Sequence, residues 1–241
     1  MANSDENSAP NNQDARNAML TKIRRVQATD QLDAKRRQAV LDRLKVHPRN
    51  IVPKRGDGDT QHHVELFTKM MQAANTSVEE VATPGEIPGA VSRYLRSNNL
   101  PQRIRHGKDP ALTGLAWSKT PSLERSEGRA RISDEVSLSR AFAAVAESGT
   151  LVLASGQDNP TTLNFLPENH IVVVEAGRIS GNYEDTWDQL RRHYGEAVLP
   201  RTVNFISGPS RTGDIEQRME LGAHGPRRLH VIILNPESTE G

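Results

Sequence analysis

The chain has 241 residues, of which 25% are charged, 35% hydrophobic and 4% aromatic, and it contains no cysteine. The missing cysteine excludes disulfides, thiolate nucleophiles and cysteine-bound zinc or iron–sulfur centres. With 31 basic and 30 acidic residues the net charge is +1, so no overall field favours binding to nucleic acid or to an anionic membrane.

The chain starts with the polar and acidic sequence MANSDENSAP, which is unlike the basic-then-apolar start of a secretory signal. Its longest apolar runs, IVVV and VIIL, are far shorter than the ~18 residues of a membrane helix. We therefore expect a cytoplasmic protein without a membrane span.

The N-terminal part predicts a tail followed by a helical arm. Residues 1–14 offer almost nothing to bury, and we expect them to be disordered. Residues 15–50 form an arm whose helix runs to Val46, with a break near Asp30, before His47-Pro48 stops it. This predicted helix contains nine Lys and Arg residues but only three Asp residues. Because no aromatic residues are interleaved with the basic ones, a solvated basic surface is favoured over nucleic-acid binding.

Residues 51–241 alternate between helix and strand patterns. Helices are predicted at residues 61–74, 86–98, 134–148 and 182–194, the third of them alanine-rich. Strands are predicted at residues 77–82, 102–106, 150–155, 170–175, 202–207 and 229–234. The segment between 107 and 133 is expected to be irregular apart from a small element near 112–117. β-Branched runs separated by helices indicate an α/β fold with three layers and a mostly parallel sheet.

Two of the strong strands end in the same way. Each is followed by Ser-Gly and a polar loop, at residues 155–162 and 207–214, that leads into a predicted helix. In open α/β sheets ligands bind beyond the carboxyl ends of strands, and a helix N-terminus favours an anion. The second loop also carries Arg211, which can grip a carboxylate or a phosphate. Turn chemistry alone also explains such loops, and Asp214 has the spacing of a helix cap.

A third candidate is the turn Gly222-Ala223-His224-Gly225-Pro226. His224 is a possible general acid or base, although a histidine in a turn more often bonds a backbone carbonyl. Asp214 and Glu216 are two residues apart, which argues against a paired-carboxylate hydrolase. Nucleotide motifs and metal-ligand spacings are missing from the sequence, so we expect no cofactor and no metal.

The runs FISGPSRTGDIEQRMELGAHGPRRLHVIIL (205–234) and AESGTLVLASGQDNPTTLNFLPENHIVVV (146–174) closely resemble the LUD-domain family, in particular its lactate-utilisation protein C branch. The sequence HPRNIVP (47–53) is similar to that branch as well. The resemblance implies a fold like that of the phosphosugar-isomerase and CoA-transferase-like superfamily. It also implies a place in a three-component system that oxidises L-lactate to pyruvate, in which two partner proteins carry the iron–sulfur clusters.

The resemblance adds Gly149-Thr150 to the candidate site, and catalytic residues remain unassigned, with Asp214, Glu216 and His224 as candidates. The candidate ligand-binding residues are Gly149, Thr150, Ser155, Gly156, Ser207, Gly208, Ser210, Arg211, Thr212, Asp214, Glu216, Gly222, His224 and Gly225.

Two functions are open at this point. The first is a non-redox accessory subunit that joins iron–sulfur partner proteins and binds a small anionic ligand at loops 207–226. The second is a stand-alone enzyme that acts on a phosphorylated, carboxylated or CoA-linked small molecule.

Overall fold

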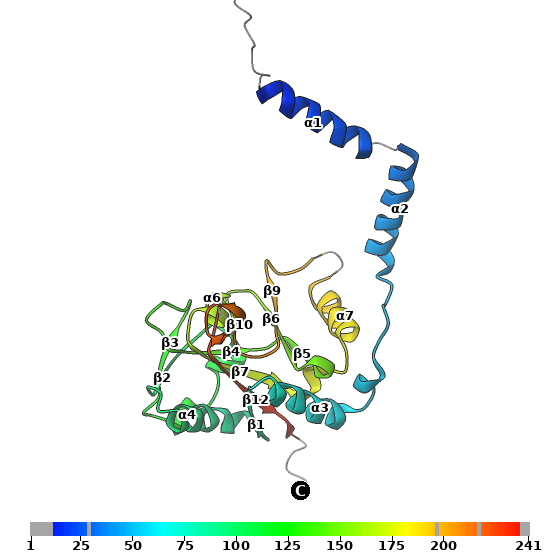
Figure 1. The fold of residues 1–241 in the computed structure, drawn as a ribbon. Helices are drawn as coiled ribbons and strands as arrows, with labels where there is room; N and C mark the ends of the chain where they lie inside the picture. Colours follow the sequence, from blue (N-terminus) through cyan, green and yellow to red (C-terminus); the bar gives the residue numbers. More distant parts are fainter. Residues whose placement is uncertain (1–11, 28–29, 196–197, 216–217, 237–241) are drawn as a thin grey trace, which may run out of the picture. The chain divides into compact units, whose positions relative to one another are not determined.

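The computed structural model describes residues 12–27, 30–195, 198–215 and 218–236. The chain divides into two compact units, residues 1–50 and 51–241. The first contains two helices, α1 (Asn12–Gln27) and α2 (Asp30–Val46), drawn in blue in Figure 1. Residues 1–11 of the predicted disordered tail lie outside the described residues. Residues 12–14, the last part of that tail, belong to α1.

A six-stranded parallel sheet forms the centre of the second unit, in the order β1-β12-β7-β4-β2-β3, and every neighbouring pair in it is parallel. The predicted α/β fold with a mostly parallel sheet is confirmed. Its strands are β1 (Ser77–Val81), β12 (Arg228–Leu234), β7 (Asn169–Glu175), β4 (Val136–Arg140), β2 (Arg103–His106) and β3 (Glu124–Glu127).

The central strands β12, β7 and β4 are buried on both faces, to which successive side chains of a strand point alternately. In β7, Val172 and Val174 belong to one apolar cluster, while Ile171 and Val173 belong to the other. Helix α3 (Thr60–Ala73) contributes its apolar stripe to the first cluster. The second cluster is covered by α4 (Ile87–Ser97) and the short α5 (Pro110–Thr113).

A second sheet of four strands shares the cluster under α3, and the sequence did not predict it. Its order is β8-β5-β6-β9, with antiparallel pairing of β6 to both β5 and β9. Helix α7 (Tyr183–Tyr194) packs on its other face through Leu190 and Trp187 (Figure 1). The strands are β8 (Ile179–Ser180), β5 (Ala143–Val145), β6 (Thr150–Ala154) and β9 (Val203–Ile206).

The helix predicted over residues 134–148 is wrong, because this segment forms β4 and β5. Alanine favours helices, but pairing with two neighbouring strands and full burial outweigh that preference. The alternation Val-Ser-Leu-Ser over 136–139 already has the two-residue period of a strand. Strand β3 likewise lies in the segment that was expected to be irregular.

Leu138 lies in β4 and is 0% exposed, so replacing it tests the strand assignment energetically. We expect Leu138→Ala to lower the free energy of unfolding by about 2–5 kcal/mol, because it opens a cavity in the core. The control is Ile132→Ala, where the side chain is 94% exposed and the expected change is within about 0.5 kcal/mol. Urea denaturation measures both, and equal effects of the two substitutions would contradict the packing.

Candidate functional site

The two Ser-Gly loops do not share one edge of the molecule. Strands β6 and β9 run antiparallel, with Leu151 opposite Ile206 and Ala154 opposite Val203. The loop after β6 therefore begins beside the start of β9, and the loop after β9 begins beside the start of β6. The two loops lie a strand length apart, about 17 Å. The expectation that both follow strands of the parallel sheet is wrong.

The helix predicted after the second loop is also wrong. Strands β10 (Arg211–Ile215) and β11 (Arg218–Leu221) pair here in an antiparallel manner. The described residues 211–215 and 218–221 provide no helix N-terminus for an anion, and Asp214 is a strand residue instead of a helix cap. Glu216 lies outside the described residues. After the first loop, α6 (Thr162–Phe165) is only four residues long.

A cavity of about 280 Å³ lies where the 207–211 loop meets the 224–226 turn. Phe165, Phe205 and Leu229 supply apolar wall, and Arg211 is the permanently charged residue among the side chains described as lining the cavity. The predicted site residues that line it are Ser207, Gly208, Ser210, Arg211, His224 and Gly225. The structure thus brings together the core of the predicted site.

Ser210 joins the two segments around this cavity. Its backbone N–H donates to the carbonyl of Pro226 over 2.8 Å, and its carbonyl accepts from the N–H of Gly222 over 3.0 Å. Its hydroxyl accepts from the N–H of His224 over 3.2 Å. The Arg211 guanidinium donates to the carbonyl of Ala74, just beyond α3. The loop is therefore fixed from both sides, and His224 lies exposed at the surface.

The pair Gly149-Thr150 is connected to the cavity through the Thr150 hydroxyl, which contacts the cavity-lining Ser207. The Thr150 hydroxyl lies 2.6 Å from the Ser207 hydroxyl and 2.9 Å from the Tyr183 hydroxyl. Gly149 itself has a structural role: its φ is +60°, and a Cβ would lie 2.9 Å from the backbone nitrogen of Met71. The predicted residue thus supports the packing against α3.

The remaining predicted residues divide between other surroundings. Gly222 has φ +87° and closely approaches the side chain of Arg227, which accounts for a glycine there. Thr212 follows Arg211 in β10, and its buried hydroxyl has no partner among the described residues. Ser155 and Gly156 line a separate cavity of about 770 Å³ at the far end of β6, together with three cationic residues. These cations are Lys108, Arg129 and Arg201.

The sequence reasoning missed two buried polar residues that line the 280 Å³ cavity. Asn164 of α6 is 1% exposed, and His170 of β7 is 0% exposed. The His170 Nε2 lies 3.0 Å from the Ser139 hydroxyl. Burial lowers the pKa of His170 to about 3, so the imidazole is neutral at physiological pH. For His170 the available signal was a polar residue at the start of a buried strand.

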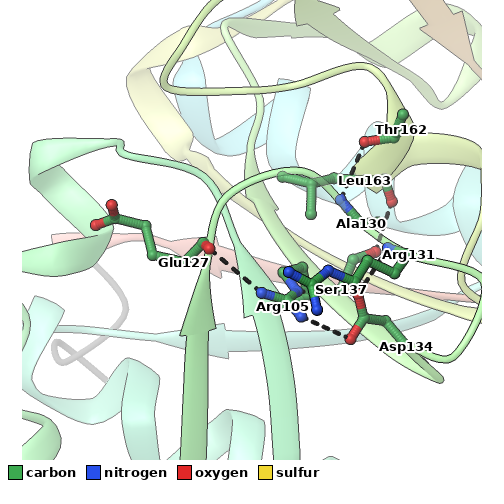
Figure 2. A network of polar contacts seen from close by, with 8 residues as sticks. All are labelled: Arg105, Glu127, Ala130, Arg131, Asp134, Ser137, Thr162 and Leu163. Atoms are coloured by element: carbon green, nitrogen blue, oxygen red, sulfur yellow. Dashed lines mark hydrogen bonds and ion pairs between the residues drawn. The ribbon is translucent and has the colours of Figure 1, made fainter.

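A network of polar contacts holds α6, and with it Asn164, against the parallel sheet (Figure 2). The Ser137 hydroxyl donates to the carbonyl of Leu163 over 2.6 Å, and the Thr162 hydroxyl accepts from the N–H of Ala130 over 3.0 Å. Asp134 accepts hydrogen bonds from the Arg105 guanidinium at 2.9 and 3.1 Å, and these bonds anchor the loop that contains Ala130. Although burial opposes it, bonding to Arg105 and to the Arg131 N–H lowers the pKa of Asp134.

Comparison with known proteins finds matches over the segments that surround the cavity. The LUD domain family model matches residues 64–234, which include every element that surrounds the cavity. The chain belongs to the LUD domain family. The resemblance predicted from the sequence is thereby confirmed.

Two relatives of this LUD domain are named lactate utilization protein C. The protein from Bacillus pumilus is 32% identical over 193 residues, which cover 72% of this chain and 79% of the relative. The protein from Shouchella clausii is 32% identical over 119 residues, and the match spans about half of either chain, 49% and 51%. A crystal structure of a DUF162 family protein from Deinococcus radiodurans shares the fold, with a TM-score of 0.58 at 22% identity, and covers 74% of this chain and 100% of that one.

Within the described part of the LUD chain, no helix has the length and apolar character needed to cross a membrane. The described residues likewise contain no group of three or more His, Asp or Glu side chains placed to hold a metal ion.

Gly149 allows a direct test of its structural role. We expect Gly149→Ala to lower the free energy of unfolding by about 2 kcal/mol or more, because the left-handed backbone and the contact with Met71 both disfavour a side chain. Gly177→Ala is the matched control, since a Cβ there meets nothing within 4 Å. Thermal or urea denaturation compares them, and an unchanged Gly149→Ala protein would contradict this role.

Two buried histidines predict acid sensitivity. Burial lowers the pKa of His170 to about 3 and that of His230 to about 4, against an ordinary value of 6.5. Below pH 6.5 the unfolded chain takes up protons that the folded chain does not, so stability falls as the pH falls. Between pH 7 and pH 5 we expect a loss of about 2 kcal/mol for each imidazole.

Urea denaturation at the two pH values measures this loss. His170→Gln is expected to show a smaller difference between pH 7 and pH 5 than the unmodified protein, whatever its stability at pH 7. His224→Gln, which replaces an exposed histidine, is the control and should keep the original difference. The same pH dependence in all three proteins would show that the buried His170 is not its source.

Proposed function

We propose that this LUD-domain protein is a non-redox accessory component of a system that oxidises L-lactate to pyruvate together with iron–sulfur partner proteins. The names of its relatives support a role in lactate utilisation. The sequence has no cysteine with which to hold such a cluster. In this proposal the partner proteins carry the electrons, and this chain binds a ligand.

The observation that carries the ligand proposal is the 280 Å³ cavity in the Ser207–Pro226 region. Its volume is just below the ~300–1,000 Å³ typical of pockets for drug-sized molecules, so it suits a small metabolite. Arg211 supplies positive charge, and Phe165 and Phe205 supply apolar surface beside it. A short carboxylate fits this combination of size and charge.

The alternative is an enzyme that acts on a phosphorylated, carboxylated or CoA-linked molecule. The separate 770 Å³ cavity favours it, because Lys108, Arg129 and Arg201 line that cavity and its volume would admit a nucleotide-sized ligand. In the smaller cavity His224 remains the candidate proton carrier of this alternative. Thermal-shift screening against lactate, pyruvate, sugar phosphates, CoA and nucleotides separates the two functions.

The assembly part of the proposal is tested in a bacterium that carries this chain. Deletion is expected to impair growth on L-lactate and lactate-dependent oxygen uptake, and the tagged protein is expected to co-purify with iron–sulfur proteins. Growth on another carbon source is the control. Normal lactate oxidation in the deletion strain, together with the absence of iron–sulfur proteins from the purified sample, would contradict an accessory role.

The binding part predicts the effect of removing the charge at the cavity. We expect Arg211→Ala to weaken the binding of L-lactate or pyruvate roughly tenfold or more, since a hydrogen bond to a charged group contributes about 1.5–3 kcal/mol. Arg201→Ala removes an arginine at the other end of β6 and should leave this binding unchanged. Isothermal titration calorimetry measures both, and equal affinities would exclude Arg211 from the site.

A further inference from the structure

Two cationic residues follow neighbouring strands at the carboxyl edge of the parallel sheet. Strand β2 ends at His106 and β3 ends at Glu127, and the two residues are partners in the register. The N–H of Gly128 continues this pairing by donating to the His106 carbonyl over 2.8 Å. Lys108 and Arg129 come next, each two residues beyond the pair, so both leave the sheet at the same edge. Ligands of open α/β sheets usually bind at this carboxyl edge.

A third cationic residue lines the same 770 Å³ cavity from the second sheet. Arg201 precedes Thr202, whose backbone N–H and carbonyl bond the Ser155 hydroxyl and N–H, each over 2.9 Å. The loop after β6 also contacts the end of β2, because the Lys108 N–H donates to the Gln157 carbonyl over 3.4 Å. No Asp or Glu is among the side chains described as lining this cavity.

The positive charges of this cavity are largely uncompensated within the described protein. The guanidinium groups of Arg129 and Arg201 form neither a hydrogen bond nor an ion pair with the residues that the structure describes. Lys108 has a long ion pair, with its Nζ 3.8 Å from the Glu127 carboxylate, and these side chains are 62% and 47% exposed. A cavity lined by charges of one sign focuses the potential and attracts ligands of the opposite sign.

Two hydroxyl groups add hydrogen-bond donors at fixed positions. Ser155 Oγ accepts from the N–H of Thr202, and Thr162 Oγ1 accepts from the N–H of Ala130 over 3.0 Å (Figure 2). Both residues line the cavity and are partly exposed. A hydroxyl group has a proton to donate in addition to its acceptor sites, and neither proton is donated to another described residue. Each is therefore left for an acceptor on a ligand.

We infer that this cavity binds a ligand that carries two or more linked phosphate groups. Arginine bonds phosphate in a bidentate way, and lysine, serine and threonine are common partners of phosphate oxygens. A single carboxylate would compensate one of the three cations and fill little of the 770 Å³. None of the side chains described as lining the cavity is aromatic, so the phosphates and not a stacked base provide the recognition.

This phosphate site goes beyond the proposed carboxylate site at Arg211 and does not depend on it. The two cavities lie at opposite ends of β6, since Ser207 bonds Thr150 at the start of the strand while Ser155 follows its end. Both ligands can therefore be bound at the same time.

The test uses inorganic pyrophosphate as the probe, titrated into the full-length protein by calorimetry. One molecule per chain is expected to bind at least tenfold more tightly than orthophosphate, because a single phosphate reaches fewer of the cations. Citrate is the control for charge alone, and excess L-lactate should leave the affinity for pyrophosphate unchanged. No binding of pyrophosphate, equal affinity for orthophosphate or citrate, or competition by L-lactate would each overturn the inference. The affinity for L-lactate itself is measured separately and decides the proposed carboxylate site.

Substitution of the unpaired arginines identifies the cavity that is used. Arg129→Ala and Arg201→Ala are each expected to weaken pyrophosphate binding tenfold or more and to leave L-lactate binding unchanged. Arg96→Ala is the matched control, since Arg96 is exposed in α4 and lines neither cavity. Urea denaturation verifies that each variant is folded. Unweakened pyrophosphate binding in both folded cavity variants, or an equal loss in Arg96→Ala, would place the ligand elsewhere and overturn the inference.

Discussion

Antiparallel pairing between β6 and β9 positions the candidate site of this LUD domain. The pairing places Ser207 beside Thr150 at one end and Thr202 beside Ser155 at the other. Because two neighbouring antiparallel strands point in opposite directions, the loops that follow them begin at opposite ends of the pair. The Ser-Gly loop after β9 therefore lies next to Gly149-Thr150. The Ser-Gly loop after β6 lines the separate cavity that contains the three cationic residues.

The parallel sheet gives this arrangement its rigid base. Its strands β7 and β12 bury alternate side chains in two apolar clusters, so a shift by one residue would move each of these side chains into the other cluster and disrupt the packing of both. The same strands present His170 and Leu229 to the cavity near their amino-terminal ends. Ligands of open α/β sheets usually bind at the opposite, carboxyl edge. The cavity lies at the amino edge because residues 207–211 and 224–226 line it there beside His170 and Leu229.

Two buried polar side chains beside this cavity lower the stability of the fold. Apolar residues at positions 164 and 170 would fit a buried environment better than an unpaired amide and an imidazole whose protonation is suppressed. Proteins retain such costly groups mainly where a function needs them. Glycines with left-handed backbone at 149 and 222 follow the other rule, since close packing alone accounts for them.

The sequence by itself determined the α/β class, the apolar strands of the parallel sheet, the family and the central site motif around Ser207–Arg211 and His224–Gly225. These features depend on local pattern: apolar runs, turn residues and a specific string. Tertiary structure alone decided three others: that the alanine-rich segment 143–145 forms strand β5, that β6 and β9 belong to a second sheet, and that Asn164 and His170 line the cavity. The physical reason is that strand pairing and burial depend on partners far away in the chain, whose direction and register no local pattern contains.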